Sequence, residues 1–269
     1  MWSDGENGAP FGAPPPDRRG MEATVRDAVA QGHVSLAFQP VVQALRPDRV
    51  AFHAGLIRVL DPQGRPLPEA EVAAAVEATA TGRELDRLAL RLGLEALAAE
   101  PGLRLSVGMS ARSIGYPRWT RALREGLMRD RTVGERLILE IPERSALLLP
   151  DLVAPFIADQ ARQRISFALA GFGAGYTALR HLTELRFDLL KLDGGLVRGV
   201  ARHPQNQVLI RALATVAATF DIFTLAPSVD RGEDADWLTG AGIDCLQGSY
   251  FAAPTMHPPW VSLGPRAQA

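Results

Sequence analysis

Cysteine, net charge and long apolar runs are all scarce in this chain of 269 residues. Its single cysteine, Cys245, excludes an internal disulfide framework and, in an apolar strand-like segment, indicates an inert buried thiol. The formal net charge of −1 gives no global basic field, so nucleic-acid binding is not expected. No apolar run reaches the ~18 residues of a membrane span, and the first residues lack a secretory signal. We therefore expect a cytoplasmic protein without membrane association.

The signatures of several common catalytic sites are also missing. The chain has no GxSxG, Walker A or CxxC pattern, and its five histidines form no short metal-ligand pair. Gly171, Gly173 and Gly175 partly match a dinucleotide fingerprint, but Tyr176 occupies the position of the last glycine. We interpret these glycines as a tight turn that needs unusual backbone angles.

What the sequence does contain is a regular alternation of strand-like and helix-like segments. The strand-like segments are 34–42, 50–59, 103–109, 136–141, 165–170, 187–192, 222–226 and 242–246. The helix-like segments are 69–78, 83–99, 118–128, 149–163, 176–184, 204–220 and 231–239. Such alternation at this length predicts a closed, TIM-like (β/α)8 barrel. The connection 45–49 is too short for a helical crossover, so the first strand should pair antiparallel with the second.

The ends of the chain differ in composition from this central part. Residues 1–20 are rich in glycine and proline and predict a disordered tail, and 257–269 predict a flexible one. Residues 21–256 form one barrel domain in this interpretation.

Polar residues at the ends of the predicted strands are the first candidates for a site. Glu140, Lys191, Asp193 and Gln247 all stand at or just after such ends. In barrels of this class the site lies at the carboxyl ends of the strands. Each residue alone is as consistent with a structural role as with a functional one.

Five segments, in order and spacing, resemble motifs of the EAL family of bacterial cyclic di-GMP phosphodiesterases. They are FQPVV at 38–42, LSVGMS at 105–110, LEIPE at 139–143, LKLD at 190–193 and QGSYFAAP at 247–254. The segment AGFGAGY at 170–176 is similar to the family's DDFGxGY turn. The resemblance spans about residues 21 to 256 and implies a barrel whose first strand is antiparallel.

The chain departs from this family where the resemblance would place metal ligands. An alignment on Arg58 puts Gly55 at the alanine of the Glu-Ala-Leu motif. The ligand positions themselves hold Ala54, Gly108, Ala170, Gly171 and Pro227, and only Glu140 keeps a ligand side chain. Lys191 and Gln247 match the family pattern. The chain is therefore identified as a degenerate member.

These departures bear directly on catalysis. The resemblance implies that hydrolysis uses two divalent cations to activate water and neutralise developing charge. Mg²⁺ and Mn²⁺ prefer oxygen ligands, which alanine, glycine and proline side chains do not offer. We therefore expect no metal cofactor, no catalytic residues and no ordinary phosphodiesterase activity.

Binding without hydrolysis stays open. The resemblance implies that Gln39, Arg58, Lys191 and Gln247 would contact cyclic di-GMP, Arg58 through phosphate. The alternative for Arg58 is a salt bridge at the rim, for example with Glu140. The favoured hypothesis is a non-hydrolytic signalling and protein-interaction module, the alternative is a cyclic di-GMP receptor, and an active phosphodiesterase comes third.

The sequence identifies no protein partner. The resemblance implies pairing near the sixth strand, over 177–185 and 194–200, so a homodimer is predicted. Its apolar candidates are Leu179, Leu182 and Leu196, each of which is equally compatible with burial in the core.

Overall fold

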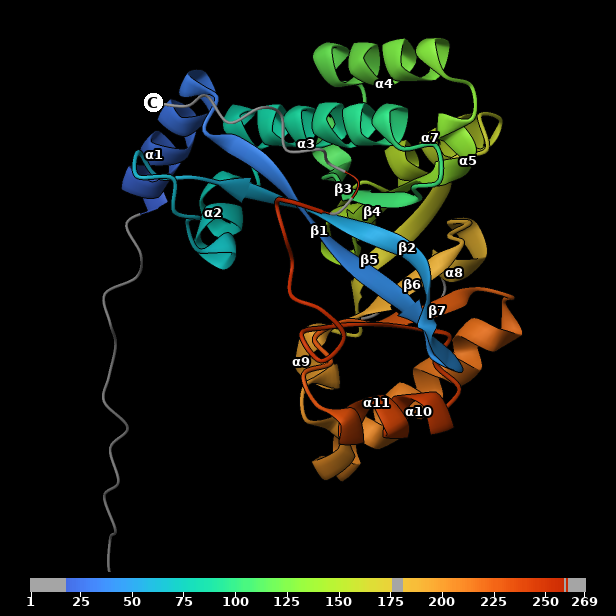
Figure 1. Ribbon diagram of the computed structural model, residues 1–269. Helices are drawn as coiled ribbons and strands as arrows, with labels where there is room; N and C mark the ends of the chain where they lie inside the picture. The colour runs from blue at the N-terminus through green and yellow to red at the C-terminus, as the bar shows by residue number, and fades with distance from the viewer. Residues whose placement is uncertain (1–17, 176–180, 259, 261–269) are drawn as a thin grey trace, which may run out of the picture.

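The computed structural model describes residues 18–175, 181–258 and 260. Eight strands in this part of the chain close into a barrel in sequence order (Figure 1). The first strand is antiparallel to both of its neighbours, and the other neighbouring strands are parallel. The predicted (β/α)8 barrel with a reversed first strand is confirmed.

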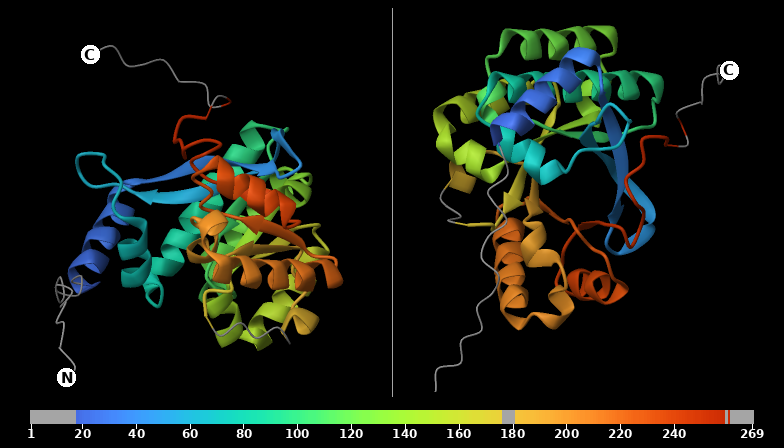
Figure 2. Two further views of the ribbon diagram at one scale, coloured as in Figure 1. Left: turned by 90° about the horizontal axis from the view of Figure 1, so that it is seen from below. Right: turned by 90° about the vertical axis from the view of Figure 1, so that its left-hand side faces the viewer.

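The strands lie close to their predicted positions. They are β1 (Val34–Gln43), β2 (Arg46–Val59), β3 (Leu105–Gly108), β4 (Leu137–Pro142), β5 (Ser166–Phe172), β6 (Leu189–Leu192), β7 (Phe223–Ala226) and β8 (Cys245–Gln247). β2 begins before the predicted residue 50, because the chain turns tightly after Gln43. β1 and β2 form a long ribbon that runs past the barrel toward α1 and α2 (Figure 2).

Helices and single turns fill the connections. The longer helices are α1 (Arg18–Gln31), α2 (Glu69–Val76), α3 (Ala80–Ala99), α4 (Pro117–Arg129), α7 (Pro150–Ala161), α10 (Pro204–Thr219) and α11 (Gly232–Gly240). The short ones are α5 (Val133–Arg136), α6 (Glu143–Leu148), α8 (His181–Glu184), α9 (Gly194–Val197), η1 (Ala111–Ser113) and η2 (Val200–Arg202). Of the helix predicted over 176–184, residues 176–180 lie outside the described residues. None of the described helices is long and apolar enough to cross a bilayer.

Alternation of side chains along the strands produces two apolar layers. Every second residue points into the barrel, where Phe52, Ala54, Ile138, Ala168 and Leu225 belong to a small cluster. The intervening residues pack outward against the helices in a much larger cluster. The inward set carries the candidate site, because it continues toward the mouth with polar residues.

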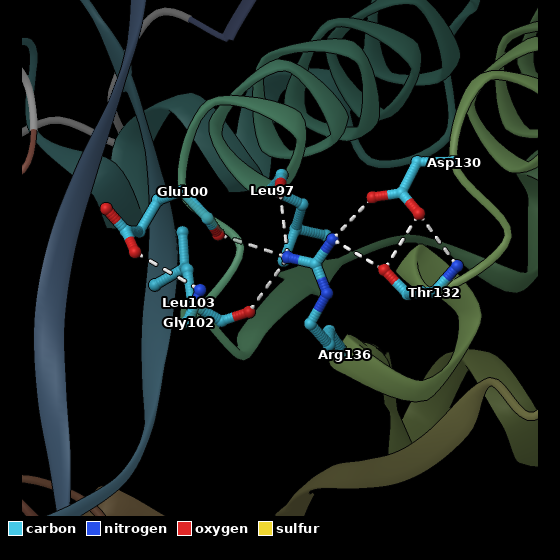
Figure 3. Close-up of polar contacts among 7 residues, drawn as sticks. All are labelled: Leu97, Glu100, Gly102, Leu103, Asp130, Thr132 and Arg136. Carbon is cyan, nitrogen blue, oxygen red and sulfur yellow. Dashed lines mark hydrogen bonds and ion pairs between the residues drawn. The ribbon is translucent and has the colours of Figure 1, made fainter.

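The guanidinium of Arg136 ties the end of α3 to the start of β4 (Figure 3). Its Nη1 donates to the carbonyl oxygens of Leu97, Glu100 and Leu103, at 2.8, 3.1 and 3.3 Å. Its Nη2 donates to Asp130 Oδ2 at 2.7 Å and to Thr132 Oγ1 at 3.1 Å. The prediction that the strand begins at residue 136 was wrong by one residue, because Arg136 ends α5 and caps the carbonyls of α3.

Ordered contacts reach slightly beyond the predicted barrel domain at both ends. α1 begins at Arg18, within the segment assigned to the N-terminal tail. The ring of Trp260 lies edge-on to Phe38 and His53, with centroids 5.7 and 4.5 Å apart. His53 is thus half-buried on β2, and burial lowers the pKa of its imidazole.

Candidate functional site

The mouth of the barrel holds a carboxylate that is already bound on both sides. Ser106 on β3 donates to Glu140 Oε1 at 2.6 Å, and the Lys191 ammonium on β6 donates to Glu140 Oε2 at 2.9 Å. The Glu140 and Lys191 side chains are only 11% and 13% exposed. The structure therefore places Glu140 and Lys191 on one face, as the sequence predicts.

Strand register explains why these side chains meet. Glu140 on β4 lies opposite Gly108 on β3 and Ala168 on β5, and Lys191 on β6 lies opposite Ala170. Ser106 points inward because it is two residues from Gly108. Sequence reasoning missed Ser106, although this alternation was the signal that places it beside Glu140.

Two glutamines form a second, separate pair. Gln247 Nε2 donates to Gln39 Oε1 at 2.8 Å, and Gln39 Nε2 donates to the carbonyl of Ala252 at 2.9 Å. Both side chains are buried. Gln247 Oε1 is also buried and has no hydrogen-bond partner among the described residues.

Arg58 stands apart from both pairs. It lies on β2 near the end of the long ribbon, where its Nη1 contacts Glu69 Oε2 at 2.7 Å and the Ile57 carbonyl at 3.0 Å. The Glu69 side chain is 61% exposed, so this is a surface ion pair. The salt bridge suggested for Arg58 does form, but its partner is Glu69 on α2 rather than Glu140.

The substituted positions lie around the same mouth. Ala54 is buried in the barrel interior, Ala170 pairs with Lys191, and Pro227 directly follows β7. A Cβ atom added at Gly108 or Gly171 would meet no atom within 4 Å. These positions therefore present small groups and open space rather than side-chain oxygens. Gly173, directly after β5, has φ +92°, which confirms that the turn uses glycine geometry, and Gly171 has φ +71° at a register shift within β5.

This donor set does not fit a pair of divalent cations. Each oxygen of Glu140 already accepts a hydrogen bond, one of them from a cation. Among the described residues, no group of three or more histidine, cysteine, aspartate or glutamate side chains gathers to hold a metal. One carboxylate neutralised by lysine is a poor ligand for Mg²⁺ or Mn²⁺.

A second carboxylate, Asp86 on α3, organises the loop that follows β3. Its Oδ2 accepts from the Ser110 N–H at 2.8 Å and from the Ser113 hydroxyl at 2.5 Å. Burial raises the pKa of Asp86 to about 6, although both hydrogen bonds lower it. Sequence reasoning did not single out Asp86, since nothing local links it to a loop more than 20 residues away.

Two of the three apolar residues proposed for dimerisation are described, and both pack against the core. Leu182 is buried in the core, and Leu196 is partly buried against it. Leu179 lies outside the described residues. The homodimer stays a prediction without an interface assigned to it.

Comparison with known families agrees with this architecture. The profile of the EAL domain matches residues 22–254, and the chain therefore belongs to the EAL domain family. Glu140, Lys191, Gln39 and Gln247, whose contacts define the mouth, all lie within the matched part.

Curated relatives resemble the chain at about a quarter identity. An uncharacterised protein, y4lL of Sinorhizobium fredii, is 26% identical over 238 residues, which is 88% of this chain and 29% of the relative. The cyclic di-GMP phosphodiesterase PdeA of Borreliella burgdorferi is 25% identical over 203 residues, 74% of this chain and 30% of that protein. The chain thus spans about three tenths of the length of these relatives.

Solved structures share the fold. The EAL domain of FimX from Pseudomonas aeruginosa, bound to cyclic di-GMP, superposes with a TM-score of 0.78 at 24% identity. The match covers 88% of this chain and 97% of that domain. A cyclic di-GMP complex of the phosphodiesterase PaMucR has a TM-score of 0.76 at 22% identity, covering 88% and 97%.

Proposed function

We propose that this chain is a catalytically degenerate EAL domain that acts as a non-hydrolytic signalling and protein-interaction module in cyclic di-GMP-related regulation. The observation that carries the proposal is the state of Glu140. The one strand-end carboxylate retained at a ligand position is bound by Lys191 and Ser106 instead of being free for a metal.

The chemistry of phosphodiester hydrolysis supports this assignment. The reaction needs an activated water and a positive charge that stabilises the transition state. Lys191 supplies one positive charge, but Glu140 neutralises it. No metal ligands remain at Ala54, Gly108, Ala170, Gly171 or Pro227 to lower the pKa of a water. The side chains at the mouth can therefore hold one another, but they do not generate a nucleophile.

The partners of the expected nucleotide contacts favour an interaction module over a receptor. Lys191 is bound to Glu140, and Gln39 is bound to Gln247 and Ala252. Arg58 is paired with Glu69 at the surface. A nucleotide that contacts the Lys191 ammonium or the Gln39 amide would first have to replace these interactions.

A receptor for cyclic di-GMP is the second candidate, and two observations favour it. The Arg58–Glu69 pair is open to solvent on its Glu69 side, with that side chain 61% exposed and Arg58 18% exposed, so a phosphate could compete with Glu69 for the guanidinium. Gln247 Oε1 is a buried acceptor that lacks a donor among the described residues, and a ligand N–H would satisfy it. EAL domains with the same fold hold this nucleotide in solved structures.

Calorimetric titration with cyclic di-GMP, with and without Mg²⁺, distinguishes the candidates. An interaction module gives no binding heat under either condition. A receptor binds equally well without Mg²⁺, and Arg58→Ala weakens that binding by about 2–3 kcal/mol, as expected for a hydrogen bond to a charged group. Recovery of the linear dinucleotide after a titration with Mg²⁺ would contradict the proposal.

A further inference from the structure

A groove of about 950 Å³ between α4 and α7 lies on the flank of the barrel. The two helices touch through Trp119 and Phe156, whose rings meet edge to face with centroids 5.8 Å apart. α4 lies outside α3 in Figure 1, with α7 beside them. The groove ends at Glu135 and Arg164, which precede β4 and β5 and so belong to the end of the barrel opposite the mouth.

The floor of the groove is apolar. Trp119, Leu123, Leu127 and Phe156 line it and are buried or half-buried. Met128, which also lines it, is 71% exposed, and a flexible thioether of this kind adapts to varied apolar partners.

The rim of the groove is basic, although the whole chain is nearly neutral. Four arginines and two carboxylates line it. Arg164 pairs with Glu135, and Arg162 lies 3.9 Å from Asp159. These pairs leave Arg124 and Arg131 exposed, and neither forms an ion pair with another described residue.

One polar group beneath the groove also lacks a partner. The indole N–H of Trp119 is buried and has no acceptor within the described parts of the chain. A buried donor without an acceptor is uncommon in folded proteins. Because this nitrogen is shielded from solvent, a partner in the groove would reach it only after the side chains above it shift, and the binding proposed for this groove does not depend on it.

We propose that the α4–α7 groove binds an acidic amphipathic helix of a partner protein. Its apolar face covers Met128 and Phe156, and its carboxylates pair with Arg124 and Arg131. This inference rests on the proposed role as an interaction module and names the surface and the chemistry of the partner.

The charge pattern favours an acidic helix over a nucleic acid. A polyphosphate backbone would run along the rim and meet the carboxylates of Glu135 and Asp159. A helix presents its charges on one side only and buries apolar side chains on the other, which matches an apolar floor with two unpaired arginines. Since the groove lies away from the mouth, such a partner leaves Glu140 and Arg58 uncovered.

The test uses a designed 18-residue acidic amphipathic helix, labelled with fluorescein and carrying a benzophenone on its apolar face. Fluorescence anisotropy should show saturable binding to the full chain. Arg124→Glu with Arg131→Glu should weaken it at least about tenfold, because both contacts become repulsive. Arg46→Glu with Arg49→Glu, which makes the same charge change on the exposed start of β2, should leave it unchanged. Irradiation should crosslink the peptide to Met128.

Several outcomes would overturn the inference. They are equal binding of a peptide with lysine in place of glutamate, crosslinks outside the groove, and tighter Arg124-dependent binding of a labelled RNA. If the double charge reversal lowers the melting temperature, Arg124→Gln with Arg131→Gln replaces it. Hydrolysis of cyclic di-GMP by the same preparation would refute the proposed function and leave the peptide result standing.

Discussion

At the scale of single residues, the ion pair of Lys191 and Glu140 is the contact on which the proposed lack of a metal centre rests. Their side chains are mostly buried and 2.9 Å apart, so each charge depends on the other. An ion pair of this kind holds the mouth together. The same ion pair occupies the Glu140 carboxylate, which a divalent metal ion would need as a ligand.

Removal of one partner should therefore cost more than removal of both. Lys191→Met should lower the free energy of unfolding by about 3–5 kcal/mol, because Glu140 stays buried without its counter-ion. The double variant Glu140→Gln with Lys191→Met should recover a large part of that loss. Urea denaturation of the two single variants and the double variant measures the coupling. Strictly additive losses, or rescue of Lys191→Met by Mg²⁺, would argue that Glu140 is a metal ligand instead.

Asp86 gives the molecule a defined pH dependence. Its folded pKa of about 6 lies above the ordinary value of 3.8, so the folded state binds more protons between these values. The stability from this group is complete below the ordinary pKa of 3.8 and is lost as the pH rises from there through about 6. Relative to Asp86→Asn, the wild type should lose at most about 3 kcal/mol of unfolding free energy over this pH range.

Denaturation of the wild type and Asp86→Asn from about pH 4 to 7 checks this sign. The wild type should lose stability relative to the variant as the pH rises. Asp48→Asn, at an exposed position of β2, is the matched control and should track the wild type. A stability difference that is constant with pH would contradict the assigned titration.

At the scale of secondary-structure elements, glycine at position 55 fixes how β2 packs on β3. A Cβ there would lie 2.9 Å from the Ser106 carbonyl oxygen and 3.1 Å from Leu36. Gly55→Ala should therefore destabilise the fold by about 1–3 kcal/mol, as overpacking does. Gly108→Ala is the control, since its Cβ meets nothing within 4 Å. Equal melting temperatures for both variants would mean that β2 shifts freely.

At the other end of the barrel, Arg136 fixes how α3 packs against the start of β4. Its planar fork reaches the carbonyls of α3 on one side and Asp130 on the other. A lysine offers a single ammonium that cannot span both. Arg136→Lys should lower the unfolding free energy by about 2–3 kcal/mol, and Arg129→Lys, at an exposed position of α4, should have no effect. Thermal melts of both variants test this, and a neutral Arg136→Lys would contradict the role.

The sequence predicts most of the long elements, although it misses the 14-residue helix α1, and it predicts the short helices poorly. Apolar periodicity locates the strands best where successive residues are mostly apolar and buried, as over 137–141 of β4. The first five residues of β2 are exposed, and the sequence places the start of this strand too late. Apolar periodicity does not locate α5, α6 or α9, since helices of four to six residues hold less than two turns of pattern. The sequence pattern places Arg136 in the strand. Its capping of the carbonyl groups at the end of α3 becomes visible only when the position of that helix is known.

At the scale of the whole molecule, the order of strands and helices along the sequence predicts the barrel topology. It does not predict which side chains meet across the barrel. The closed sheet brings Ser106, Glu140 and Lys191 together from three strands. The motifs predict Glu140 and Lys191 on one face, but their ion pair depends on strand register. Arg58 illustrates the opposite case, because its ion pair is formed with Glu69 on α2 and not with Glu140.

The most direct test of the account is a hydrolysis assay with cyclic di-GMP in the presence of Mg²⁺ or Mn²⁺. The purified chain should give no linear product above a buffer blank, and Ala170→Asp should restore none, because the residues of a metal site act together. An active phosphodiesterase of the EAL family serves as the positive control. Metal-dependent turnover that disappears in Glu140→Gln would contradict the central claim that this barrel has lost its chemistry.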